Sequence, residues 1–96
     1  MVSLREFGGT LSNLRNILII EDNESIGAAV ALALTNENYD ARHALTGEQG
    51  LTMIEESPPA LVLCDIMLPG IDGLEGLRRT KSSHPNIQFI MLTARA

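Results

Sequence analysis

Apolar residues occur along the chain in short continuous runs that are separated by longer, more polar stretches. The runs at residues 17–20, 61–64 and 87–92 contain almost only aliphatic side chains, which is typical of strands that are buried on both faces. Residues 39–45 alternate more loosely between apolar and polar side chains, and this pattern predicts a second, more exposed strand. We therefore expect four strands.

The stretches between these runs have the spacing of amphipathic helices. Asn23 is placed to cap the first helix, and the pairs Thr46 with Gln49 and Asp72 with Glu75 have the form of a capping box for the second and third. In the first helix we expect an inward apolar face made of Ile26, Ala29, Val30, Ala33 and Leu34. Strands that alternate with helices predict an α/β fold with a doubly wound parallel sheet, whose ligand chemistry lies at the carboxyl ends of the strands.

Residues 1–15 differ from the rest of the chain, and we treat them as an N-terminal extension to a domain that spans residues 16–96. Their apolar residues have helical spacing, but Gly8 and Gly9 interrupt the stripe, and glycine disfavours helix; the stripe is Leu4, Phe7, Leu11 and Leu14. A loose tail and a short packed helix both remain open for this segment.

Composition excludes several classes of protein. The chain has 96 residues, a formal net charge of −5 and a single cysteine, which fit one small domain and exclude an internal disulfide. Its apolar runs are too short for a membrane span, and no export signal is visible. The acidic balance argues against direct nucleic-acid binding by this segment. We expect a cytoplasmic protein that does not bind a membrane.

Candidate chemistry gathers where the predicted strands end. Glu21 and Asp22 follow the first strand, Asp65 follows the third, and Thr93 follows the fourth. Carboxylates at close range repel one another, so a bound cation or a shared proton is needed to keep them together. Oxygen ligands of this kind suit Mg²⁺, and the Thr93 hydroxyl can donate to a phosphoryl oxygen. This set of residues is suited to placing a phosphoryl group on a carboxylate.

The remaining candidates have ordinary structural interpretations. Cys64 points away from its neighbour Asp65 if side chains alternate along the strand, so we interpret it as a small core residue. His43 and His84 are interpreted as surface residues, and a zinc site is not expected because neither has the local spacing of a ligand set.

Three segments, ILIIEDNESI, LVLCDIMLPGIDGLEGLRR and IMLTAR, resemble the receiver domain of bacterial two-component response regulators. The resemblance covers about residues 16–95, with the motifs in the expected order. It implies a flavodoxin-like, receiver-type three-layer sandwich and a function in signal transduction.

The resemblance also implies a role for each site residue. Asp65 would be the phosphoacceptor and Thr93 the switch hydroxyl. Asp22 and Asp65 would bind Mg²⁺ together with the backbone carbonyl of Met67, while Glu21 would act through water. The implied partner is a sensor histidine kinase or a phosphotransfer protein, and the implied module is a phosphoacceptor rather than a turnover enzyme.

The chain departs from the family pattern after its fourth strand. The family continues with a helix, a strand that ends in a lysine, and a last helix, whereas the only lysine of this sequence is Lys81. We therefore expect a receiver domain that is incomplete at its C-terminus and lacks the last helix-strand-helix. The strand at 87–92 would have an unpaired edge suited to self-association, and one sheet face would be covered by the first helix alone.

Two other functions remain open from the residues. A phosphatase of the haloacid dehalogenase type also uses an aspartyl nucleophile, but it needs a second aspartate two residues later, where this chain has Met67. An inactive pseudo-receiver that only mediates assembly is the other alternative.

Overall fold

Strands and helices alternate along the chain in the computed structural model, which describes residues 15–65 and 73–92. The elements run in the order β1 (Asn16–Ile20), α2 (Glu24–Asn36), β2 (Asp40–Ala44), α3 (Gly47–Glu56), β3 (Leu61–Asp65), α4 (Gly73–Ser83) and β4 (Gln88–Leu92). Each of the four expected strands is present, so the predicted alternation is confirmed. The apolar stripe of the N-terminal extension lies outside the described residues.

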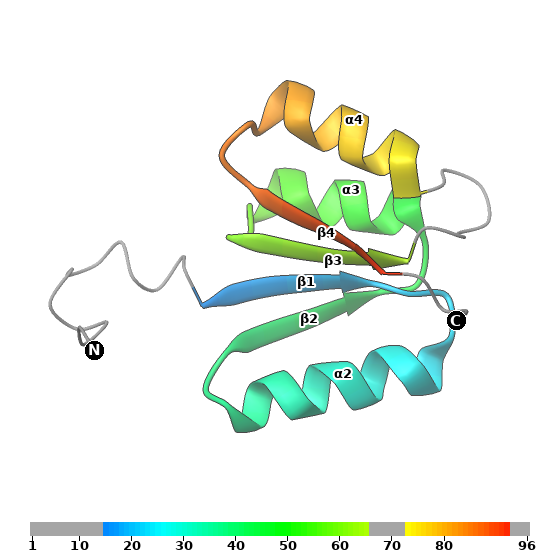
Figure 1. Cartoon of the computed structure of the whole chain (residues 1–96), viewed down its shortest axis with the longest axis vertical. Coiled ribbons are helices and arrows are strands. Elements are labelled where there is room, and N and C mark those ends of the chain that lie inside the picture. The colour runs from blue at the N-terminus through cyan, green and yellow to red at the C-terminus, as the bar shows by residue number, and fades with distance from the viewer. Residues whose placement is uncertain (1–14, 66–72, 93–96) are drawn as a thin grey trace, which may run out of the picture.

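The described strands form one parallel sheet in the order β2-β1-β3-β4. The two most apolar strands, β1 and β3, are central, and the more polar β2 lies at an edge, as the sequence pattern predicts. All four arrowheads point to the same edge of the sheet (Figure 1). The predicted doubly wound parallel sheet is therefore confirmed, and the segments that follow the strands are brought together at that edge.

Side-chain caps begin the first two helices. The Asn23 side-chain oxygen accepts a hydrogen bond from the Ile26 amide at 3.0 Å, and the Thr46 hydroxyl oxygen accepts one from the Gln49 amide at 3.0 Å. The Gln49 side chain accepts from the amide of Leu45, one residue before Thr46. Both predicted caps are thus confirmed, with the return contact of the capping box moved by one residue.

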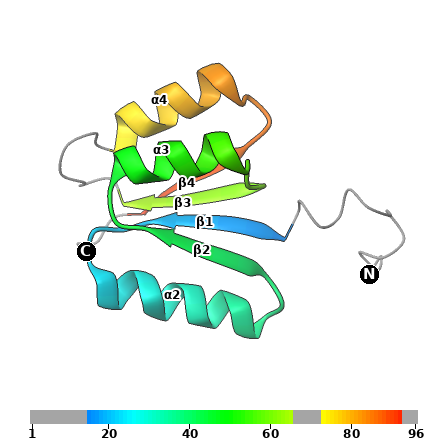
Figure 2. The same cartoon turned by 180° about the vertical axis from the view of Figure 1, so that it is seen from behind.

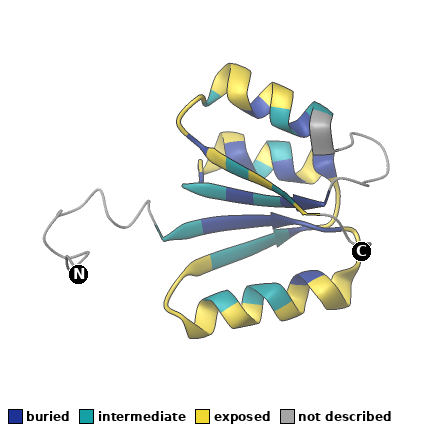
Figure 3. Ribbon diagram, in the orientation of Figure 1, coloured by how far each residue is buried: buried dark blue, intermediate teal, exposed yellow. Residues whose placement is uncertain are grey.

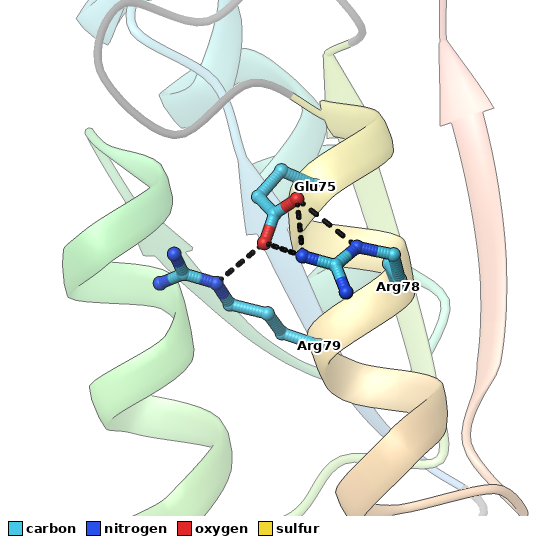
Figure 4. A network of polar contacts seen from close by, with 3 residues as sticks. All are labelled: Glu75, Arg78 and Arg79. Atoms are coloured by element: carbon cyan, nitrogen blue, oxygen red, sulfur yellow. Dashed lines mark hydrogen bonds and ion pairs between the residues drawn. The ribbon is translucent and has the colours of Figure 1, made fainter.

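Helix α4 has a charged outer face. The Glu75 carboxylate lies between the guanidinium groups of Arg78 and Arg79 (Figure 4) and accepts from them at 2.6 and 2.7 Å. These contacts hold the pKa of Glu75 below its usual value, mainly through the hydrogen bond from Arg78. Both arginines are exposed to solvent. Asp72, the expected cap of this helix, lies outside the described residues.

Helices cover both faces of the sheet. Helices α3 and α4 lie on one face and α2 on the other (Figures 1 and 2). The core lies mainly between the sheet and the α3 side, where buried residues gather at the strands (Figure 3); its members are Leu18, Ile20, Ala44, Ile54, Val62, Cys64 and Ile87. Cys64 is 1% exposed, so its interpretation as a core residue is confirmed.

The α2 face is only partly covered. Helix α2 packs against β2 and, less extensively, against β1, whereas Ile90 and Leu92 of β4 are 48% and 39% exposed. Ile26, Ala29 and Ala33, which we expected to point inward, are exposed as well. Among the described residues this face is covered by α2 alone, as expected. The inward placement of Ile26, Ala29 and Ala33 is wrong because nothing in the described structure packs against that side of the helix.

No helix in the described part of the chain is long and apolar enough to cross a membrane.

Candidate functional site

Three carboxylates meet at the carboxyl edge of the sheet. Glu21 and Asp22 follow β1, and Asp65 is the last residue of β3. Because Ile20 of β1 pairs with Cys64 of β3, the residues that come next on the two strands are neighbours. One carboxylate oxygen from each acid lies within 4.8 Å of the others. The convergence expected for these three residues is therefore confirmed.

The Glu21 backbone and side chain are held by neighbouring residues. Its amide donates to the carbonyl oxygen of Ala44 at 3.0 Å, which extends the pairing of β1 with β2 by one residue. Its carboxylate accepts from the amide of Asn23 at 3.0 Å. The acidic side chain therefore lies beside the N-terminus of α2, where unpaired amides and the helix dipole favour a negative charge.

The three acids differ in how far they are buried. Glu21 and Asp65 are 8% and 4% exposed, whereas Asp22 is exposed. Burial raises the pKa of Glu21 above its usual value, and the neighbouring negative charges of Asp22 and Asp65 raise it further, while the hydrogen bond from the Asn23 amide opposes them. The cluster thus gathers negative charge at a site that is partly closed to water.

This donor set fits a hard divalent cation. Carboxylate oxygens are the ligands that Mg²⁺ prefers, and Mg²⁺ commonly binds through one or two carboxylates while it keeps several waters. The exposed Asp22 leaves one side of the cluster open to solvent, which gives room for such waters. Among the described residues, the set able to hold a metal ion is Glu21, Asp22 and Asp65, and it is compatible with Mg²⁺.

Two predicted site residues, Met67 and Thr93, lie outside the described residues. Lys81 lies at the opposite end of the sheet from the acids. Its ammonium group donates to the carbonyl oxygen of Ile87 at 2.7 Å, and Ile87 immediately precedes β4, at the amino edge of the sheet. Lys81 therefore does not contribute to the acidic site.

The two histidines, which we interpreted as surface residues, are partly buried, and each makes a polar contact. His84 is half-buried and its Nε2 lies 3.0 Å from the Glu55 carboxylate. His43 is also half-buried, and its Nε2 lies 2.8 Å from the carbonyl oxygen of Glu21. Sequence reasoning missed His43 because the contact depends on how α2 packs on β2. The available signal was its place one residue before the end of an edge strand that leads to the carboxyl edge.

The molecule also has a recess of about 530 Å³ between α3 and α4. Its lining comes from residues of these helices and His84, and none of the three acids contributes to it. The acidic cluster and this recess are therefore separate features.

Comparisons with known proteins identify a family and similar sequences. The response regulator receiver domain family matches residues 17–96. The transcriptional regulatory protein AfsQ1 of Streptomyces coelicolor is 41% identical over 80 residues, which are 83% of this chain and 35% of that protein. The uncharacterized transcriptional regulatory protein YkoG of Bacillus subtilis is 42% identical over 80 residues, again 83% of this chain and 35% of that protein.

The fold has a similar counterpart among solved structures. A CheY-like response regulator receiver domain protein from Methanospirillum hungatei JF-1 superposes with a TM-score of 0.82 and 35% identity, over 86% of this chain and 66% of that one. The chain spans about a third of the length of the two regulatory proteins it matches. Its matched family, its sheet order and its acidic cluster agree with one another. The chain belongs to the family of response regulator receiver domains.

Proposed function

We propose that residues 16–96 act as a phosphoacceptor module in which Asp65 receives the phosphoryl group. The observation that carries the proposal is the position of Asp65 at the end of β3, within 4.8 Å of two further carboxylates, in a chain of the receiver family. A carboxylate oxygen of Asp65 attacks the phosphorus of a phosphohistidine, the P–N bond breaks, and its electron pair leaves on the imidazole. The product is an acyl phosphate on Asp65.

The roles of the other residues follow from the family resemblance. Mg²⁺, when bound, neutralises charge on the phosphoryl oxygens. Asp22 and the carbonyl of Met67 would hold it with Asp65, and Glu21 would act through water. Thr93 would donate its hydroxyl proton to a phosphoryl oxygen. The arrangement serves a single transfer to the protein itself, so we propose a phosphoacceptor rather than a turnover enzyme, with a sensor histidine kinase or a phosphotransfer protein as the donor.

Phosphorylation by a small donor tests this function directly. Acetyl phosphate with Mg²⁺ should add one acid-labile phosphoryl group, which intact-mass spectrometry detects, and Asp65→Asn should abolish the product. Removing Mg²⁺ with a chelator should have the same effect. Since the described part of the chain has no lysine at the acidic cluster, we expect a lower yield than from a receiver domain that has this cation.

A matched variant controls for the loss of a carboxylate as such. Asp40 starts β2 at the amino edge of the sheet, so Asp40→Asn should be phosphorylated like the unaltered chain. Phosphorylation that persists in Asp65→Asn, or that proceeds equally well without Mg²⁺, would contradict the proposed function.

We also propose self-association through β4. This strand is an edge of the described sheet, and its residues Ile90 and Leu92 are 48% and 39% exposed. An exposed apolar edge strand is a ready template for pairing with another chain. The partner that fits it is a second copy of this chain.

A further inference from the structure

His43 lies beneath the first turn of α2. It pairs in register with Ile19 of β1, so both side chains point to the α2 face of the sheet. Gly27 of α2 makes room for the imidazole, because a Cβ atom at that position would lie 2.0 Å from His43 Nε2. Any larger residue at position 27 would displace the ring.

The imidazole reaches the backbone between the two adjacent acids. His43 Nε2 lies 2.8 Å from the carbonyl oxygen of Glu21. A carbonyl oxygen only accepts, so Nε2 carries the proton and donates it. The Glu21 carbonyl belongs to the peptide group that leads into Asp22, and this contact therefore restrains the orientation of that peptide plane.

The peptide groups on either side of this one are restrained as well. The Glu21 amide donates to Ala44 at 3.0 Å, and the Asn23 amide donates to the Glu21 carboxylate at 3.0 Å. Asp22 itself is exposed. The backbone at residues 21–23 carries this carboxylate, and His43 binds the Glu21 carbonyl of that segment.

We propose that His43 is a positioning residue for the acidic cluster. It holds the Glu21–Asp22 peptide so that the Asp22 carboxylate stays within reach of Glu21 and Asp65. The part of this inference that concerns metal affinity rests on the proposed function, whereas the part that concerns the backbone does not. Partners that orient metal ligands from outside the ligand set typically change metal affinity about 10-fold to 100-fold when they are removed.

Two substitutions distinguish the effect of the His43 hydrogen-bond donor from the effect of the volume of its ring. His43→Leu removes the donor and keeps a bulky side chain, while His43→Gln keeps an N–H donor near the position of Nε2. In metal-free buffer, amide hydrogen exchange at Asp22 and Asn23 should be faster in His43→Leu and close to that of the unaltered chain in His43→Gln. In a titration with Mg²⁺ followed by amide chemical shifts, the Kd should rise about 10-fold in His43→Leu and recover in His43→Gln.

Gly27→Ala supplies an independent variant. Its added methyl group displaces the imidazole ring although residue 43 is still histidine. It should reproduce the exchange and affinity changes of His43→Leu. Thermal unfolding of all three variants separates positioning from stability, since a purely structural role would lower the unfolding midpoint and leave the Kd unchanged.

Asp22→Ala tells failure of this inference from failure of the proposed function. If the unaltered chain and Asp22→Ala respond equally to Mg²⁺, the proposed metal site is refuted. The hydrogen-exchange data still decide whether His43 positions the backbone. Exchange at Asp22 that is the same in His43→Leu and in the unaltered chain would overturn the inference. Amide exchange at Asp22 that is as fast in His43→Gln as in His43→Leu would overturn the inference too.

Discussion

The adjacent acids Glu21 and Asp22 differ in burial because the pairing of β1 with β2 ends at Glu21. Glu21 continues the backbone pairing of β1 with β2 and is 8% exposed, whereas Asp22 begins the turn into α2 and is exposed. Burial raises the pKa of Glu21, and the charges of Asp22 and Asp65 add to this effect. In the absence of a cation, the ionised Glu21 therefore opposes folding.

This opposition predicts a pH-dependent effect of Glu21→Gln. Glutamine keeps an acceptor for the Asn23 amide but carries no charge. Because the folded-state pKa of Glu21 is raised, the native chain loses stability as the pH rises from the ordinary value of 4.5 through the folded-state value. With a chelator present, Glu21→Gln should unfold at a higher temperature than the unaltered chain at neutral pH, and the two should converge below pH 4.5.

Thermal unfolding across this pH range, with and without Mg²⁺, measures the effect. Mg²⁺ should stabilise the unaltered chain by mass action and reduce the advantage of the variant. A difference between the two proteins that does not depend on pH would contradict this account of Glu21.

At the scale of the elements, two helices differ in how closely they approach their neighbours. Gly50 lets α3 lie directly on β1, because a Cβ atom at this position would be 2.5 Å from Cδ1 and 2.9 Å from Cγ1 of the buried Ile20. For Gly76 of α4, no atom of a neighbouring element among the described residues lies within 4 Å of where a Cβ atom would be. The same residue type thus serves close packing in one helix and only weakens the other.

The two glycines form a matched pair of variants. Gly76→Ala should stabilise the protein by about 1 kcal/mol through helix propensity. Gly50→Ala should destabilise it by about 1 kcal/mol, because an overpacking cost of about 1–3 kcal/mol exceeds the same gain in propensity. Urea unfolding measures both changes. Equal stabilisation by the two substitutions would show that Ile20 moves aside without cost.

The whole molecule has two unequal faces. In the described part of the chain, helices α3 and α4 cover one face, and α2 covers only part of the other (Figures 1 and 3). The open part carries Ile90 and Leu92 on β4, beside the half-buried Leu61 and Leu63 of β3. Apolar area on this face combines with the free edge of β4, and both favour association with another chain.

Lysine substitutions at the exposed positions of β4 should therefore oppose association. Ile90→Lys and Leu92→Lys place charges on the exposed row of the edge strand, and such charges hinder edge-to-edge pairing. Leu32→Lys is the matched control, because Leu32 is 62% exposed but lies on α2. Sedimentation at micromolar concentration should show larger species for the unaltered chain and the control than for the β4 variants. A monomeric unaltered chain would refute self-association.

Local pattern was enough to predict much of this protein. Continuous apolar runs and alternating helical stretches predict the strands, the helices and the parallel sheet, because burial on both faces and short crossovers leave few other arrangements. The cap residues Asn23 and Thr46 act where the sequence places them, since a cap is a contact within four residues. The acids Glu21, Asp22 and Asp65 converge because parallel strands end at one edge.

Contacts between distant residues were decided by the tertiary structure alone. The half-buried state of His43 depends on Gly27, sixteen residues earlier in the chain, and no periodicity within β2 reports on that neighbour. Ile26, Ala29 and Ala33 have the spacing of an inward face, yet they are exposed because helical periodicity defines a face without specifying what packs on it. Burial of Glu21 beside an exposed Asp22 likewise depends on where β1 stops pairing with β2. Sequence determined which elements form and which groups meet, and tertiary packing decided which of those groups are buried, oriented and held.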